Sequence, residues 1–237
     1  MSLSDPPRKP MENRLLAALP SEVKARLEPN LERVSLPFKE VLYKSREVIE
    51  YVYFPINGVV SMLTTLEDGN LAEVGLVGNE GMVGLSVFLG IKATPFTGIV
   101  QVPGEAMRMR ADVFKDSVNP DSPFHTLLLR YTYVLMLQIA QSAGCNSHHS
   151  VEERCCRWLL MTSDRVQSDQ FPITHEFLSQ MLGVRRASIT VVAGMLQKAE
   201  LIRYSRGQMT IKDRPGLEAV SCECYQLVKE EEDCLQS

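Results

Sequence analysis

The chain of 237 residues is long enough for two modest domains, and its 45% hydrophobic and 23% charged content is typical of a globular protein. No apolar run reaches the roughly 18 residues that a membrane span needs, and the first ten residues lack the apolar segment of a secretory signal. We therefore expect a cytoplasmic protein without a membrane partner. The net charge of −4 does not exclude nucleic acid, because seven basic and only three acidic side chains lie between Thr174 and Gly216.

Short apolar runs separated by turn residues occupy the region from Val34 to Arg110. This spacing predicts an all-β roll or barrel, with a hairpin turn at Asp68-Gly69. Two short helical segments are expected before it, the second with Ser21 as N-cap. A further short helix is expected from Asp112, again as N-cap, to about Ser117.

A long helix is expected from about Phe124 to Asn146, because apolar residues recur there at steps of three and four. We interpret this face as a two-fold dimer seam, and packing against the chain's own β domain is the alternative. The expected interface residues are Phe124, Leu128, Tyr131, Leu135, Gln138 and Ser142.

The segment from Ser150 onward has the signature of a helix-turn-helix. Ser150 and Glu153 form a capping-box pattern, Thr174 is a second N-cap, and Gly183 permits a sharp turn between two helices. The second of these helices has Ile189, Val192, Met195 and Leu196 as its expected inner face.

The outer face of that helix begins with basic and polar residues, which is the pattern of a recognition helix in the major groove of double-stranded DNA. Two short strands joined at Arg206-Gly207 would form a wing that contacts a phosphate. The predicted DNA-binding residues are Thr174, Arg185, Arg186, Ser188, Thr190, Val191, Lys198 and Arg206. A ligand-binding or interaction module without DNA binding is the alternative function.

These residues resemble the Crp–Fnr superfamily, the cyclic-AMP receptor protein and its relatives. The resemblance extends over nearly the whole chain and includes Ile173-Thr174, Gln180, Gly183, Arg186, Leu201-Ile202, the Val52-Tyr-Phe-Pro segment and the Gly78-Asn-Glu-Gly-Met-Val-Gly segment. It implies an α+β chain with a jelly-roll sensor domain over 12–123, a dimerisation helix and hinge over 124–149, and a winged helix-turn-helix over 150–237. It also implies a transcriptional regulator that binds a palindromic operator as a homodimer, with RNA polymerase as a further candidate partner.

The sensor domain departs from the cyclic-AMP pocket of that family. Gly84-Leu85-Ser86 stands where the family has the glutamate that holds the ribose, and residues 94–98 contain no arginine for the cyclic phosphate. Because a buried phosphate needs a cation, we do not expect cyclic AMP to be the effector. A small-molecule effector of unknown identity is expected near Gly81, Gly84, Leu85, Ser86 and Thr97.

The six cysteines are expected to be reduced structural thiols, and we expect neither a metal nor a cofactor. Two incomplete ligand groups are present: Cys222 and Cys224 with Cys234, and Cys145 with His148 and His149. The two histidines are interpreted as hinge or packing residues. All four histidines lie outside the β region, and no nucleophile elbow, P-loop or dinucleotide motif occurs, so we do not expect an enzyme.

Overall fold

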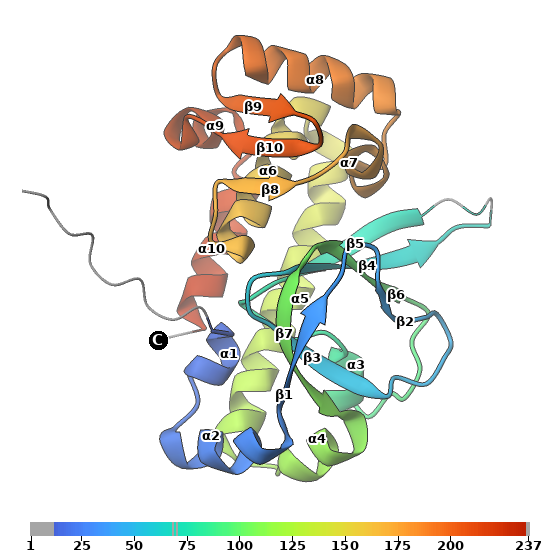
Figure 1. Ribbon diagram of the computed structural model, residues 1–237, viewed down its shortest axis with the longest axis vertical. Helices are drawn as coiled ribbons and strands as arrows, with labels where there is room; N and C mark the ends of the chain where they lie inside the picture. The colour runs from blue at the N-terminus through green and yellow to red at the C-terminus, as the bar shows by residue number, and fades with distance from the viewer. Residues whose placement is uncertain (1–11, 68, 70, 236–237) are drawn as a thin grey trace, which may run out of the picture.

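The computed structural model describes residues 12–67, 69 and 71–235 (Figure 1). The N-terminal segment and the Asp68 position of the predicted hairpin turn lie outside these residues. Among the helices described, none combines the length and apolarity that a membrane crossing requires.

The N-terminal domain is a β roll made of two antiparallel sheets, as the turn pattern predicted. Their strand orders are β1-β7-β3 and β2-β6-β4-β5. The strands are β1 (Glu32–Leu36), β2 (Val41–Tyr43), β3 (Tyr51–Pro55), β4 (Val59–Thr65), β5 (Leu71–Val77), β6 (Thr97–Val102) and β7 (Gly104–Arg110).

Short helices close the ends of the roll. They are α1 (Arg14–Ala17), α2 (Ser21–Leu27), the 3-10 turn η1 (Glu28–Asn30), α3 (Leu85–Phe88) and α4 (Ala111–Ser117). Two predicted caps are wrong by one or two residues: Ser21 is the first residue of α2, whose N-cap is Pro20, and Arg110 rather than Asp112 is the N-cap of α4. Figure 1 shows α2 and α4 at the lower end of the molecule, whereas Arg14 of α1 pairs with Asp233 near the C-terminus at 2.8 Å.

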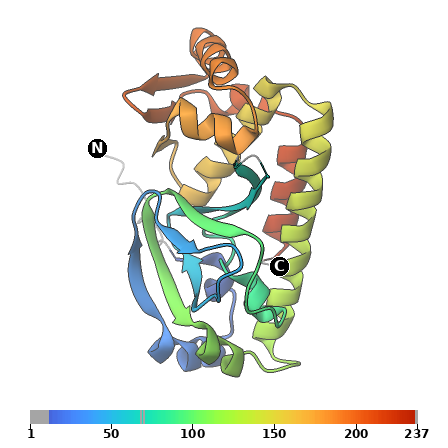
Figure 2. The ribbon, with the colours of Figure 1, turned by 90° about the vertical axis from the view of Figure 1, so that its right-hand side faces the viewer.

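Helix α5 (Pro123–His148) runs along nearly the full height of the molecule (Figure 2). Its face predicted as a dimer seam packs instead on the β roll of the same chain. Of the six residues predicted for the seam, five are at most 5% exposed: Phe124, Leu128, Tyr131, Leu135 and Gln138. The sixth, Ser142, is half-buried. The seam assignment is therefore wrong for the five buried residues, because their side chains are already buried within their own subunit, and it stays a prediction for Ser142.

The C-terminal domain is a winged helix-turn-helix. It comprises α6 (Val151–Val166), β8 (Gln170–Pro172), α7 (His175–Leu182), α8 (Arg186–Lys198), β9 (Ile202–Ser205), β10 (Gln208–Ile211), α9 (Arg214–Val220) and α10 (Cys224–Cys234). The predicted capping box is present at the start of α6: Ser150 Oγ accepts from the Glu153 amide, and the Glu153 carboxylate accepts from the Ser150 amide. The three strands form a sheet of order β8-β10-β9.

The two domains share one buried cluster. Val59, Leu63, Leu76 and Val102 of the β roll belong to the same hydrophobic core as α6, α7 and α8. Apolar side chains in one continuous core move together, since packed interiors have few voids. The β roll and helices α6, α7 and α8 are thus packed against each other in this conformation.

Candidate nucleic-acid interface

The helix pair α7 and α8 is positioned by its local sequence. Thr174 Oγ1 accepts from the Phe177 amide at 3.1 Å and caps α7, as predicted. Gly183 ends α7 with φ +63°, a left-handed conformation that glycine adopts without a Cβ penalty. The inner face of α8 comprises Ile189, Val192, Ala193 and Leu196, so the expectation for Met195 is wrong: it is 45% exposed.

The first turn of α8 presents basic and polar side chains to solvent. Arg185 is its N-cap, Arg186 is its first residue, and both are exposed, while Ser188 is half-buried. Arg186 makes a long contact with Glu176, Nε to Oε2 at 3.9 Å, and both side chains are more than 60% exposed. An exposed pair of this kind is weakly held, so the guanidinium is available to a base edge or phosphate.

A second contact group orients the middle of α8, and sequence reasoning missed its central residue. His175 stacks on Tyr204 with ring centroids 4.3 Å apart, and its Nδ1 lies 3.2 Å from Thr190 Oγ1. Partial burial, followed by the nearby Arg186 charge, lowers the pKa of His175, which favours the neutral imidazole. The group connects α7, α8 and the wing, and it leaves Thr190 and the 61%-exposed Val191 on the outer surface.

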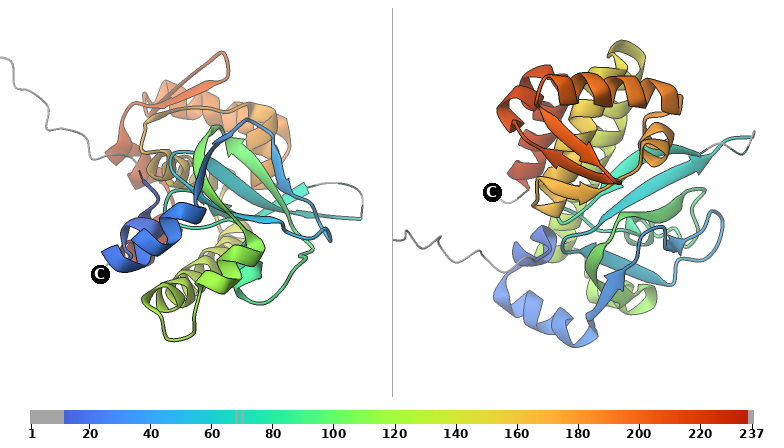
Figure 3. Two further views of the ribbon diagram at one scale, coloured as in Figure 1. Left: turned by 60° about the horizontal axis from the view of Figure 1, so that its bottom comes forward. Right: turned by 45° about the horizontal axis from the view of Figure 1, so that its top comes forward.

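The wing has the geometry that its sequence predicted. Arg206 and Gly207 have φ values of +51° and +77°, as a tight two-residue hairpin turn between β9 and β10 requires. Arg206 is exposed at the tip, and Lys198 is exposed at the last residue of α8. Figure 3, right, shows α8 along the top of the winged domain with the β9–β10 hairpin beside it.

The predicted effector residues do not enclose an open cavity at Gly81. The Tyr131 ring fills the space where a Cβ at Gly81 would lie, and its hydroxyl donates to the Met82 carbonyl at 3.3 Å. Gly84 (φ +89°) is the N-cap of α3, which starts with Leu85 and Ser86, and Leu85 belongs to the buried core. Thr97 Oγ1 accepts from the Ser45 amide at 3.2 Å.

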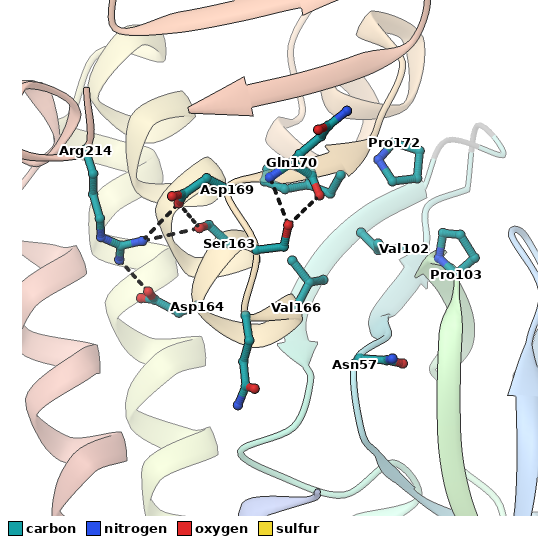
Figure 4. Close-up of a pocket in the computed structure, with 13 residues that line it drawn as sticks. Asn57, Val102, Pro103, Ser163, Asp164, Val166, Asp169, Gln170, Pro172 and Arg214 are labelled. Atoms are coloured by element: carbon teal, nitrogen blue, oxygen red, sulfur yellow. Dashed lines mark hydrogen bonds and ion pairs between the residues drawn. The ribbon is translucent and has the colours of Figure 1, made fainter. Parts of the chain in front are cut away.

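A cleft of about 620 Å³ lies instead between the two domains (Figure 4). Asn57, Val102 and Pro103 line it from the β roll, and Ser163, Asp164, residues 166–172 and Arg214 line it from the winged domain. Arg214 is held there by Asp164 and by Ser163 Oγ, so its charge is already compensated. The cleft lies at the boundary between the two domains, beside their shared core, and its lining includes none of the predicted effector residues.

Polar contacts of Trp158 and Arg165 also join the domains beyond the shared core. Trp158 Nε1 donates to Glu73 Oε1 at 3.1 Å, and burial raises the pKa of Glu73 to about 7, partly offset by hydrogen bonds from Ser61 and Trp158. Arg165 of α6 donates to Glu80 Oε1 at 3.1 Å and to Glu232 Oε1 at 2.5 Å. We call Glu80, Arg165 and Glu232 the buried ion triad.

Four possible metal ligands meet at the end of α5. They are Cys145, His149, Cys222 and Cys224, and their ligand atoms all lie within 4.8 Å of one another. The expectation of two separate, incomplete ligand groups is therefore wrong: the fold takes two residues from each group. The hydrogen bond with Cys222 lowers the pKa of the Cys145 thiol to about 5, against the opposing effect of burial.

Known families match both halves of the chain. Residues 153–220 match the Crp-like helix-turn-helix domain, and residues 33–120 match the cyclic nucleotide-binding domain. The chain belongs to the Crp–Fnr superfamily of transcriptional regulators. It combines a helix-turn-helix DNA-binding domain with a sensor domain of the cyclic-nucleotide-binding type. This agrees with the expectation that the protein is not an enzyme, since the family is non-enzymatic.

Individual relatives are distant in sequence. The Global nitrogen regulator of Nostoc sp. is 22% identical over 172 residues, which cover 68% of this chain and 77% of that protein. The structure of FixK2 from Bradyrhizobium japonicum superposes with a TM-score of 0.69 at 15% identity, covering 81% of this chain and 98% of FixK2. A CRP-family transcriptional regulator from Thermus thermophilus gives a TM-score of 0.66 at 18% identity, with coverages of 79% and 96%. These two structures share the fold of this Crp–Fnr regulator.

Proposed function

We propose that this Crp–Fnr regulator acts as a homodimer whose two α8 helices read the two halves of a palindromic DNA site. The observation that carries the proposal is the exposed basic first turn of α8, where Arg185 and Arg186 face solvent and the ion pair between Arg186 and Glu176 is long and weak. An arginine at this position can form a bidentate bond to guanine, worth about 1–3 kcal/mol of discrimination. Arg206 at the wing tip is suited to a phosphate.

The outer face of α5 supports dimerisation. Leu129, Tyr133 and Met136 are 51%, 55% and 64% exposed, and exposed Ala140 continues the same stripe. The steps of four, three and four residues place them on one side of the helix, as in a coiled-coil seam. A contiguous exposed apolar stripe of this kind favours a partner surface, and two-fold pairing brings a second identical stripe against it.

Binding-site selection from a pool of random DNA duplexes tests the DNA-binding part. Selected duplexes should share an inverted repeat whose half-sites are about one helical turn, roughly 34 Å, apart. The gel-shift affinity for that site should fall with salt, with a log–log slope of about −0.9 per phosphate contact. A salt-independent shift, or selected sequences without two-fold symmetry, would instead support a module that does not read DNA.

Two arginine variants separate base reading from phosphate binding. Arg186→Ala should relax the preference at one base pair in each half-site, because it removes a hydrogen-bond donor to a base. Arg206→Ala should weaken all sequences about equally and make the salt slope shallower by about 0.9 for each phosphate that the wing no longer neutralises. Arg33→Ala, in the exposed Arg33–Glu105 pair on the β roll, is the control and should bind like the wild type.

The dimer is tested by a charge on the α5 stripe. Met136→Glu should convert the dimer to a monomer in sedimentation velocity and abolish operator binding, because two glutamates would face each other across the axis. Leu89→Glu is the matched control, since Leu89 is a comparably exposed apolar residue (54%) at the end of α3. A dimeric Met136→Glu protein with normal operator affinity contradicts the proposed seam.

The effector is proposed to be a molecule other than cyclic AMP. The segment 94–98 has no arginine, and Tyr131 occupies the space at Gly81. Calorimetric titration with cyclic AMP should give no binding heat, and a micromolar affinity would refute this. We propose the cytoplasm as the location of this regulator, with RNA polymerase as a candidate partner there.

A further inference from the structure

Three cysteines and one histidine from distant parts of the chain converge where α5 ends. Cys145 lies in the last turn of α5, and His149 is the C-cap of that helix, whose amide donates to the Cys145 carbonyl at 3.0 Å. Cys222 and Cys224 flank the turn that connects α9 to α10, and Cys224 is the first residue of α10. All three cysteines are buried, and His149 is half-buried.

The spacing of the ligand atoms agrees with tetrahedral coordination. Zinc bonds of about 2.3 Å to sulfur and about 2.0–2.1 Å to nitrogen imply S–S and S–N edges of about 3.8 and 3.6 Å. The Cys145 Sγ–Cys222 Sγ distance is 3.5 Å, and the Cys224 Sγ–His149 Nδ1 distance is 3.6 Å. We propose that Cys145, His149, Cys222 and Cys224 form a structural zinc site of the Cys3His type.

The groups around the site fit this ligand set. Glu223 Oε2 lies 3.3 Å from His149 Nε2, so the carboxylate holds the ring with Nδ1 directed at the sulfurs. Carboxylate–histidine pairs of this kind orient metal-bound histidines. Gln141 Nε2 donates to Cys224 Sγ at 3.0 Å, which offsets part of the negative charge of a thiolate.

The alternative of a disulfide fits less well. A disulfide requires two sulfurs about 2.05 Å apart and would leave the third thiol and the histidine without a role. Four ligands around one point instead saturate the coordination of Zn²⁺, and sulfur-rich tetrahedral sites select this metal. Because no position remains for water or substrate, the site is structural rather than catalytic.

The metal would fasten together two segments that are distant in the sequence. It would join the end of α5, immediately before the Ser150 cap of α6, to the start of α10. Helix α10 runs back beside α5 (Figure 2) and contributes Glu232 to the buried ion triad. A zinc ion here would therefore fix the C-terminal segment against the hinge between sensor and DNA-binding domain.

Metal analysis of the full-length chain, produced without a polyhistidine tag and kept reduced, tests the site. Inductively coupled plasma mass spectrometry should find one zinc per chain. Replacement by Co²⁺ should give the visible bands of a tetrahedral ion and a near-ultraviolet thiolate charge-transfer band. Cys222→Ser and His149→Gln should lose the zinc, whereas Cys234→Ser, at an exposed cysteine outside the cluster, should keep it.

A milder variant keeps all four ligands, so the test does not depend on whether the ligand variants fold. Glu223→Gln removes only the carboxylate behind His149 and should lower zinc affinity by about 10–100-fold in a chelator competition. Glu230→Gln, exposed on the same helix, is its control. Chelation of wild-type protein should also lower its thermal unfolding temperature, and added Zn²⁺ should restore it.

Three results would overturn the proposal. Wild-type protein could lack zinc and give no thiolate charge-transfer band with Co²⁺. Peptide mapping could find a Cys145–Cys222 disulfide in protein isolated with its thiols blocked. Zinc could also remain at one per chain in both Cys222→Ser and His149→Gln.

Discussion

Replacing Arg165 by methionine removes the cation of the buried ion triad and keeps most of the aliphatic volume. The Arg165 side chain is 2% exposed, and Glu80 and Glu232 are 3% and 8% exposed. The triad joins the 78–81 loop of the sensor to α6 and α10. The substitution therefore tests how strongly this group holds the two domains together.

The expected destabilisation by Arg165→Met follows from the contacts that the guanidinium makes. The guanidinium donates to both carboxylates and to the Met161 carbonyl at 3.0 Å, and the variant loses all three hydrogen bonds. Removing one partner of a buried ion pair costs about 3–5 kcal/mol, because the remaining charge is uncompensated. That loss is a large part of the roughly 5–15 kcal/mol by which a domain is stable. Burial already raises the pKa of Glu232 to about 7, so this carboxyl can take up a proton and limit the loss.

Urea unfolding monitored by tryptophan fluorescence is a direct assay, because Trp158 is the single tryptophan and donates to Glu73 across the domain boundary. The loss of unfolding free energy caused by Arg165→Met should be smaller at about pH 5 than at about pH 8, since the Glu232 carboxyl, whose pKa burial raises to about 7, is more protonated at the lower pH. Adding Glu232→Gln should recover part of the stability. Arg33→Met, in an exposed pair, should stay close to wild type.

This reasoning would be refuted if the free energy of unfolding of Arg165→Met at pH 8 lay within about 1 kcal/mol of the wild-type value. It would mean that solvent enters the triad or that the domains separate easily in solution. The reasoning would also be contradicted if Arg165→Met lost the full amount, about 3–5 kcal/mol of unfolding free energy, and Glu232→Gln restored none of it. The destabilisation would then come from poorer packing rather than from unpaired charge.

The remaining predictions concern single residues. Leu135→Ala should destabilise the sensor domain by about 2–5 kcal/mol in urea unfolding, because Leu135 is buried on the inner face of α5, and an effect on dimerisation alone would refute this. The raised pKa of Glu73, about 7 against 4.5 when unfolded, means that its contribution is complete below pH 4.5 and is lost as the pH rises through 7. Glu73→Gln should flatten stability over that window, and an unchanged pH profile would show that Glu73 is not the group responsible. Ser150→Ala should cost about 1 kcal/mol by removing the capping box of α6, whereas Ser147→Ala, exposed on the last turn of α5, should cost less.

Local signals in the sequence identified the helix-turn-helix correctly. The Ser150 capping box, the Thr174 N-cap and the Gly183 turn each depend on hydrogen bonds or dihedral angles within about four residues. The wing turn at Arg206-Gly207 depends on two positive φ angles and is equally local. Once these local elements are placed, the exposed first turn of α8 and the exposed tip of the wing follow directly. His175 was missed because its stacking partner Tyr204 lies on a different element.

The face of α5 that packs on its own subunit could not be read from the sequence. Both sides of the helix carry apolar residues, and local periodicity does not say whether Leu135 or Met136 meets the β roll. The tertiary structure decided this, because Leu135 packs in the buried core of the β roll while Met136 is 64% exposed. Local periodicity also could not predict the cluster of Cys145, His149, Cys222 and Cys224, or the position of Arg165 between Glu80 and Glu232. The sequence by itself determined the helices, strands and turns through near-neighbour interactions, whereas groups more than 60 residues apart were brought together only by tertiary packing.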